Sequence, residues 1–154
     1  MQFLPGLKGM LNYHPLFVHF PIAFWLGALL FEALGVWRSS DELQRTAARL
    51  LYLGTLTALA AAGTGLLAED SVPETGAAHG VMELHQMLML ITTSVAVGLC
   101  MFAFFLRNRF TAALRKLLLA GLIVLVVLLT VGSDRGAQLV YQYATSVRLP
   151  GPSK

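Results

Sequence analysis

Apolar residues in this chain form four long runs separated by short polar connections. A helix that crosses a bilayer needs about 20 mostly apolar residues, and each run reaches that length. The pattern predicts an all-α, polytopic membrane protein that folds as a four-transmembrane-helix bundle. We expect one membrane domain over residues 1–154, with spans at residues 16–36, 47–68, 82–106 and 112–131 and a short outward tail over residues 132–154.

Composition supports this class of protein. The chain is 56% hydrophobic and 12% charged, whereas a soluble domain carries roughly 25% charged residues. The pI near 9.4 comes from short basic loops rather than from a basic face, so we expect no nucleic-acid partner. The single cysteine, Cys100, excludes a disulfide or a cysteine-based zinc or iron–sulfur site within one chain. No cleavage site follows the first run, so we expect no cleavable signal peptide.

The charges of the connections predict the orientation. Basic residues gather in the first and third connections, and acidic residues in the second. Cytoplasmic loops carry the excess of Lys and Arg, so both termini and the second connection should face outward, to the periplasm of a bacterial inner membrane. These residues are Arg38, Arg45 and Arg49, then Arg107, Arg109, Arg115 and Lys116, and in the second connection Glu69, Asp70 and Glu74.

Two polar features lie at the predicted cytoplasmic side. Ser39 with Glu42 has the spacing of a capping box at the start of the second helix. Glu32 lies inside the first run, and we expect it to pair with Arg49 or Arg115, whose long side chains can reach along the membrane interface. The alternative for Glu32 is a proton entry point in a transporter. The transporter hypothesis is less favoured because no internal repeat is evident in the sequence.

Four histidines lie toward the predicted outer face, His14 and His19 in the first span and His79 and His85 in the third. Ionisable residues inside a membrane are functional candidates by default. Counted along the two spans, His14 should lie level with His79, and His19 with His85. A b-type haem held by two imidazoles needs one from each of two helices at one depth. We therefore predict His19 and His85 as the axial ligands of the haem iron, with one haem expected and two conceivable. His14 and His79 are second choices that could contact propionates, relay protons or line a quinone pocket.

A haem also needs a slot between helices. Ala58, Ala61 and Gly65 give the second span one smooth face, which could border such a slot or simply allow close helix packing. Two rival hypotheses stay open. One is a compact copper or zinc site that uses the histidines with Glu83 or with nearby methionines. The other is a cofactor-free membrane anchor that docks a periplasmic redox enzyme. The methionines are Met82, Met87 and Met89.

Two segments carry a resemblance to a known family. The segment His14-Pro15-Leu16-Phe17-Val18-His19-Phe20-Pro21-Ile22-Ala23 resembles the opening motif of a bacterial family of membrane proteins, domain of unknown function 2231. The segment Gly136-Ala137-Gln138-Leu139-Val140-Tyr141 is similar to its tail motif, Gly-Gly-x-Leu-Val-Tyr followed by x-His-Gly. Here Gln142, Tyr143 and Ala144 follow, so the tail histidine is missing. The resemblance implies a four-helix membrane protein in a redox setting, beside c-type cytochrome or Rieske iron–sulfur domains.

These lines together predict a membrane electron-transfer subunit. Ligation by two histidines leaves no open iron position, which favours electron transfer over oxygen chemistry. The chain lacks the Cys-x-x-Cys-His motif, so any haem is non-covalent. We expect exchange of electrons between a periplasmic c-type cytochrome or iron–sulfur protein and quinone or a partner subunit. The chain would act as a non-catalytic member of a larger complex or homo-oligomer.

Overall fold

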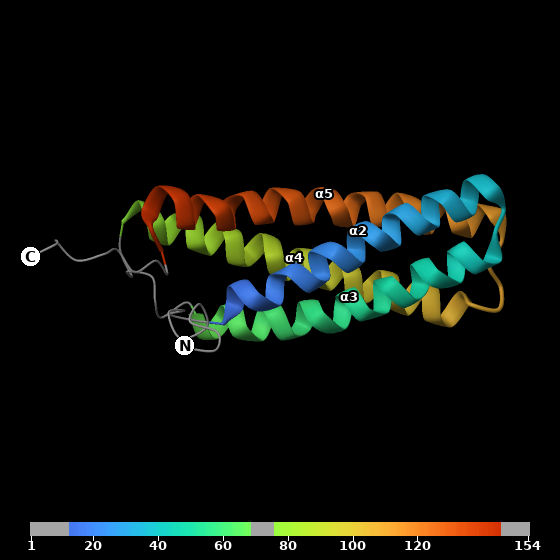
Figure 1. The fold of residues 1–154 in the computed structure, drawn as a ribbon, viewed down its shortest axis with the longest axis horizontal. Coiled ribbons are helices and arrows are strands. Elements are labelled where there is room, and N and C mark those ends of the chain that lie inside the picture. The colour runs from blue at the N-terminus through green and yellow to red at the C-terminus, as the bar shows by residue number, and fades with distance from the viewer. Residues whose placement is uncertain (1–12, 69–75, 146–154) are drawn as a thin grey trace, which may run out of the picture.

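The computed structural model describes residues 13–68 and 76–145, which form four long helices and no strand. The helices lie side by side along one long axis (Figure 1). All four are long and apolar enough to cross a membrane, which confirms the predicted all-α membrane bundle. The helices are α2 (His14–Arg38), α3 (Asp41–Ala68), α4 (Ala77–Leu106) and α5 (Ala112–Tyr143).

Each helix packs against two neighbours. α2 contacts α3 and α5, and α4 contacts α5 and α3, so α2 and α4 lie diagonally across the bundle. The α2–α3 and α4–α5 connections share one end of the bundle, which we call the loop end (Figure 1). The start of α2, at His14, and the end of α5, at Tyr143, share the opposite end, which we call the histidine end.

The helices are longer than the apolar runs. α5 continues to Tyr143, so residues 132–143, which were predicted to belong to a tail, are helical. Gly132 does not end this helix because it is buried against α4, where Leu88 and Met89 pack on it. α4 likewise begins at Ala77, before its apolar run. The acidic residues predicted to orient the second connection, Glu69, Asp70 and Glu74, lie outside the described residues.

The predicted capping box is wrong by one residue. Ser39 ends α2 in the left-handed conformation, with φ at 50°, and its backbone N–H donates to the carbonyl of Gly35. Ser40 then caps α3, because its hydroxyl accepts a hydrogen bond from the backbone N–H of Leu43 at 3.5 Å. The two helices are so close in sequence that one serine is needed to terminate the first and the next serine to start the second.

Large apolar side chains occupy both the centre and the outside of the bundle. Trp25, Leu51 and Leu118 are among the side chains buried at its centre. Leu56 and Leu67 are 67% and 81% exposed on its surface. An apolar exterior of this kind suits contact with lipid rather than with water.

The two hairpins share one burial pattern with an offset of 71 residues. Every buried position of α5 lies 71 residues after a buried position of α3, from Ala47 and Leu118 through Ala61 and Gly132. Since α2 and α4 both start at the histidine end (Figure 1), the second hairpin repeats the first about an axis along the bundle. The repeat lies in the burial pattern and not in the residue types, which is why no internal repeat is evident in the sequence. The matched pairs are Ala47–Leu118, Leu51–Leu122, Gly54–Leu125, Ala58–Leu129, Ala61–Gly132 and Ala68–Leu139 on α3 and α5, and Pro21–Thr92, Trp25–Ala96 and Glu32–Ala103 on α2 and α4.

Candidate cofactor-binding site

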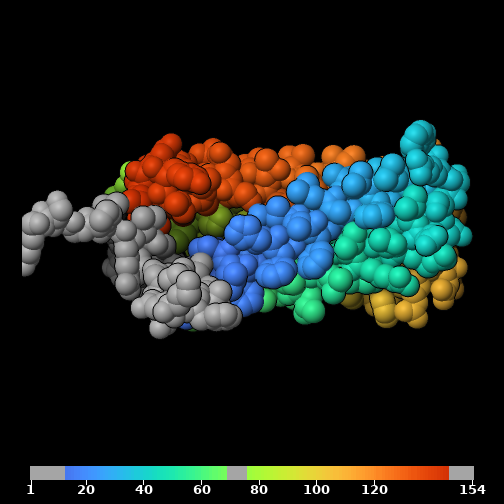
Figure 2. Space-filling model, viewed as in Figure 1, coloured from blue at the N-terminus to red at the C-terminus, as the bar shows by residue number. Residues whose placement is uncertain are grey.

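A cavity of about 440 Å³ lies at the histidine end, lined by residues of all four helices. Cofactor and ligand sites typically measure about 300–1,000 Å³. Its α3 wall consists mostly of small residues, among them Ala58, Ala61 and Gly65, so the face predicted to border a slot does border open space. In the space-filling view, α2 and α5 separate at this end and α4 is seen in the hollow between them (Figure 2).

His14, the first residue of α2, lines this cavity and is held by α3. Its Nδ1 atom lies 3.0 Å from the carbonyl oxygen of Ala61 and 3.3 Å from the hydroxyl of Thr64. The imidazole also lies flush against Gly65, where an added Cβ would meet the ring Cε1 atom at 3.1 Å. The ring is therefore fixed by the two polar contacts of Nδ1 and by one close backbone contact.

His85 on α4 is held by α5 in the same way. Its Nδ1 atom lies 2.8 Å from the carbonyl oxygen of Gly132. A Cβ added to Gly136 would meet its Cε1 atom at 3.0 Å. Each histidine thus stands 47 residues before the carbonyl that binds it, and the contacted glycine follows that carbonyl by one helical turn in both hairpins.

These hydrogen bonds decide which ring nitrogen can bind a ligand. A backbone carbonyl only accepts, so the Nδ1 atoms of His14 and His85 must carry the proton and donate it. In a neutral imidazole the other nitrogen, Nε2, then keeps its lone pair. Neither Nε2 atom has a hydrogen-bond partner within residues 13–68 and 76–145. Histidines that ligate metals have this arrangement, with the second ring nitrogen bonded to a carbonyl or carboxylate.

The other two predicted site residues differ from this pair and from each other. His19 also lines the cavity, but its side chain is largely exposed. His79 is not among the lining residues, and its Nε2 atom lies 3.4 Å from the Glu83 carboxylate on the surface of α4. The structure therefore brings together His14, His19 and His85 and leaves His79 outside.

The predicted pairing of histidines by depth is wrong. The repeat places His85, not His79, at the position on α4 that corresponds to His14 on α2. Distance from the end of an apolar run does not give the depth of these histidines, because the two helices begin at different points relative to them. α4 starts at Ala77, well before His85, whereas α2 starts at His14 itself.

A compact metal site of the usual kind is not formed by the described part of the chain. No group of three or more His, Cys, Asp or Glu side chains there could hold one ion. Met82 and Met89 line the cavity, whereas Met87 is exposed. Any metal in the cavity would depend on the imidazoles and on a ligand brought from elsewhere.

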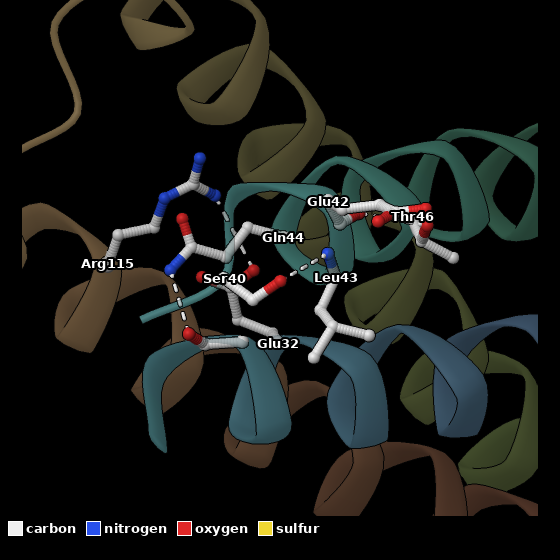
Figure 3. A network of polar contacts seen from close by, with 8 residues as sticks. Glu32, Ser40, Glu42, Leu43, Gln44, Thr46 and Arg115 are labelled. Atoms are coloured by element: carbon white, nitrogen blue, oxygen red, sulfur yellow. Dashed lines mark hydrogen bonds and ion pairs between the residues drawn. The ribbon is translucent and has the colours of Figure 1, made fainter. Parts of the chain in front are cut away.

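The loop end contains a buried ion pair, whereas the cavity lies at the histidine end. The carboxylate of Glu32 is fully buried, and one oxygen lies 3.5 Å from the guanidinium of Arg115 (Figure 3). This confirms the predicted pairing and selects Arg115 over Arg49. Arg115 also lies 3.9 Å above the ring of Phe110. Beside the pair, the Gln44 amide donates to the carbonyl of Gly35 at 3.2 Å (Figure 3). The pair joins α2 to α5, so it ties the two hairpins together.

Sequence reasoning missed the α5 wall of the cavity. Ser133, Gly136 and Leu139 line it, and the carbonyl of Gly132 binds the ring of His85. The predicted span stopped at Val131, so these residues were assigned to the tail. The spacing of Ala61 and Gly65, repeated by Gly132 and Gly136, was the signal that could have found them. Tyr141 lines the cavity, whereas Tyr143, at the position where the tail histidine would fall, is not among its lining residues.

Taken together, these features define a multi-pass membrane protein of four helices with a histidine-lined cavity at one end. The chain belongs to the family described as predicted membrane protein, domain of unknown function 2231, whose model matches residues 10–148. The two segments that carried the resemblance, at the start of α2 and near the end of α5, both line the cavity. No curated protein and no solved structure matches the chain.

Proposed function

We propose that this protein is a membrane electron-transfer subunit that holds one b-type haem in the cavity at the histidine end. The observation that carries the proposal is the pair of imidazoles, His14 and His85, which line one cavity from diagonal helices. Each has its Nδ1–H bonded to a carbonyl and its Nε2 atom without a partner among the described residues. Such a pair offers two nitrogen ligands whose tautomers are already fixed.

The surroundings of the pair fit a flat apolar group. Gly65 and Gly136 let the two imidazole rings lie flush against α3 and α5, where an added Cβ would meet them. Apart from the histidines, the lining is mostly apolar, as it is in most cofactor pockets. A haem held there would supply a reversible one-electron couple. The histidines would fix its iron, and the hydrogen bonds to Ala61 and Gly132 would orient the imidazoles.

The position of the cavity suggests how electrons would be exchanged. It lies at one end of the bundle, so a bound haem could meet a partner at that membrane face but could not span the bilayer alone. The basic residues in the loops at the other end support an orientation in which this face lies outside a bacterial inner membrane. We therefore propose exchange between a periplasmic c-type cytochrome or iron–sulfur protein and quinone or a partner subunit. The chain acts as a non-catalytic member of that complex.

The test is a dithionite-reduced minus oxidised absorption spectrum of the detergent-purified protein, with a pyridine haemochrome assay. We expect the sharp bands of a low-spin b-type haem at about one haem per chain, and no binding of carbon monoxide to the reduced form, because both axial positions are filled. A featureless spectrum from cells with adequate haem supply would overturn the proposal. Metal analysis of the same sample then separates the two rivals. Bound copper or zinc supports a metal-binding protein, and neither supports a cofactor-free anchor.

A further inference from the structure

The two histidines of the cavity belong to equivalent positions of the repeated hairpins. His14 and His85 are 71 residues apart, as are their acceptors Ala61 and Gly132. Gly65 and Gly136, which contact the rings, are separated by the same offset. The same offset therefore relates the two histidines, the two carbonyls that orient them and the two glycines that their rings contact.

The repeat extends to the cavity wall. Val18 of α2 matches Met89 of α4, and Ala58 of α3 matches Leu129 of α5, and all four line the cavity. The axis that relates the hairpins therefore passes through the cavity rather than beside it. Two donors related by such an axis approach a ligand on the axis from opposite sides and with the same geometry.

We infer that the cofactor site consists of two copies of a one-histidine module, so that His14 and His85 are the axial ligands of the haem. This assignment rests on the proposed function and replaces the pair His19 and His85 expected from sequence. His19 has no counterpart in the second hairpin, where Leu90 stands 71 residues later. His79 pairs with Glu83 on the surface, away from the cavity.

The histidine assignment is tested with four single variants, His14→Ala, His85→Ala, His19→Ala and His79→Ala, purified in the same detergent. We expect His14→Ala and His85→Ala each to lose most of the haem, or to keep a haem that binds carbon monoxide when reduced. His19→Ala and His79→Ala should keep the haem content and the low-spin spectrum of the unaltered protein. To show that a colourless variant is folded, His14→Gly and His85→Gly are purified with added imidazole, which should restore the low-spin spectrum in both.

The two glycines provide a finer test. Alanine at Gly65 or Gly136 would displace the adjacent imidazole by a few tenths of an ångström, because the added Cβ would meet the ring at 3.1 or 3.0 Å. Loss of supporting contacts around a ligating histidine typically lowers affinity 10–100-fold, and we expect each variant to bind haem roughly tenfold more weakly. Gly63→Ala is the matched control on α3, since nothing lies within 4 Å of its added Cβ. It should leave haem affinity unchanged.

The outcomes separate the two proposals. An unaltered protein that binds no haem overturns the proposed function and this assignment with it. An unaltered protein that binds haem, but loses it in His19→Ala and not in His14→Ala, overturns only the assignment. Unequal responses of Gly65→Ala and Gly136→Ala, with one variant indistinguishable from Gly63→Ala, would also overturn the symmetric module.

Discussion

The two hairpins of this bundle have the same framework and different side chains. The buried positions of the second hairpin and the start of α5 repeat those of the first hairpin with one offset, yet Trp25 and Gly54 of the first hairpin correspond to Ala96 and Leu125 of the second. The bulky residue is on α2 in one hairpin and on α5 in the other. The comparison shows that a helical hairpin can be repeated with almost no repetition of sequence, and at this level a large residue on one helix faces a small one on the other in both hairpins.

The largest expected effect concerns the ion pair that makes the hairpins unequal. Glu32 of the first hairpin has Ala103 as its counterpart, so the Glu32–Arg115 pair occurs once. Removing one partner of a buried pair costs about 3 kcal/mol or more. We expect Arg115→Ala to destabilise more than Glu32→Ala, because Glu32 is fully buried whereas the Arg115 side chain is 17% exposed and can turn toward water.

The free energy of unfolding in this experiment is measured by titration with a denaturing detergent. Arg109→Ala, at the same end and without an ion pair among the described residues, is the matched control. The double variant Glu32→Ala/Arg115→Ala should be more stable than Arg115→Ala alone. If it is not, the pair does not hold the hairpins together.

A second prediction concerns two substitutions that give the first hairpin the packing residues of the second. A Cβ at Gly54 would lie 2.5 Å from Cδ1 of Trp25, so Gly54→Leu should destabilise by about 1–3 kcal/mol through overpacking. Adding Trp25→Ala reproduces the residues of the second hairpin, Ala96 and Leu125. The double variant should recover stability relative to Gly54→Leu, as measured by the same titration. A double variant less stable than Gly54→Leu would show that the two hairpins do not share one framework.

A third prediction concerns a hydrogen bond that only the first hairpin makes. The indole N–H of Trp25 donates to the hydroxyl of Thr55 at 3.4 Å, whereas Val126 stands at the equivalent position of the second hairpin. Thr55→Val should cost about 1 kcal/mol, because the buried N–H loses its partner. Thr57→Val is the control, since among the described residues that hydroxyl bonds only to backbone carbonyls of its own helix. Equal effects of the two variants would assign no role to the indole contact.

The smallest expected effect concerns a helix cap that both hairpins have. Ser40 and Thr111 stand at equivalent positions, and each hydroxyl accepts a hydrogen bond from the backbone N–H three residues later, at 3.5 and 3.3 Å. Ser40→Ala and Thr111→Ala should each lower the free energy of unfolding by about 0.5 kcal/mol, at the weak end for helix caps because both bonds are long. A large difference between the two would show that the caps are not equivalent.

Much of the fold could be predicted from single segments of the chain. The four apolar runs gave the helices, because a membrane span is recognised by its own length and composition. The position of Glu32 inside the first run likewise predicted Arg49 or Arg115 as its partner. The boundaries were less well predicted, since α5 continues through Gly132 and Gly136 by packing against α4 and His85. Contacts with another helix decide whether such glycines interrupt a helix.

The candidate site was predicted in part. The sequence by itself determined a membrane bundle with four histidines toward one end and a smooth face at Ala58, Ala61 and Gly65 on α3. Only the tertiary structure decided which histidines share a cavity, that His79 does not, and that His14 corresponds to His85. The physical reason is that depth and direction of a side chain depend on the register between helices. That register is set by contacts such as His14 with Ala61 and His85 with Gly132, which join residues far apart in the chain.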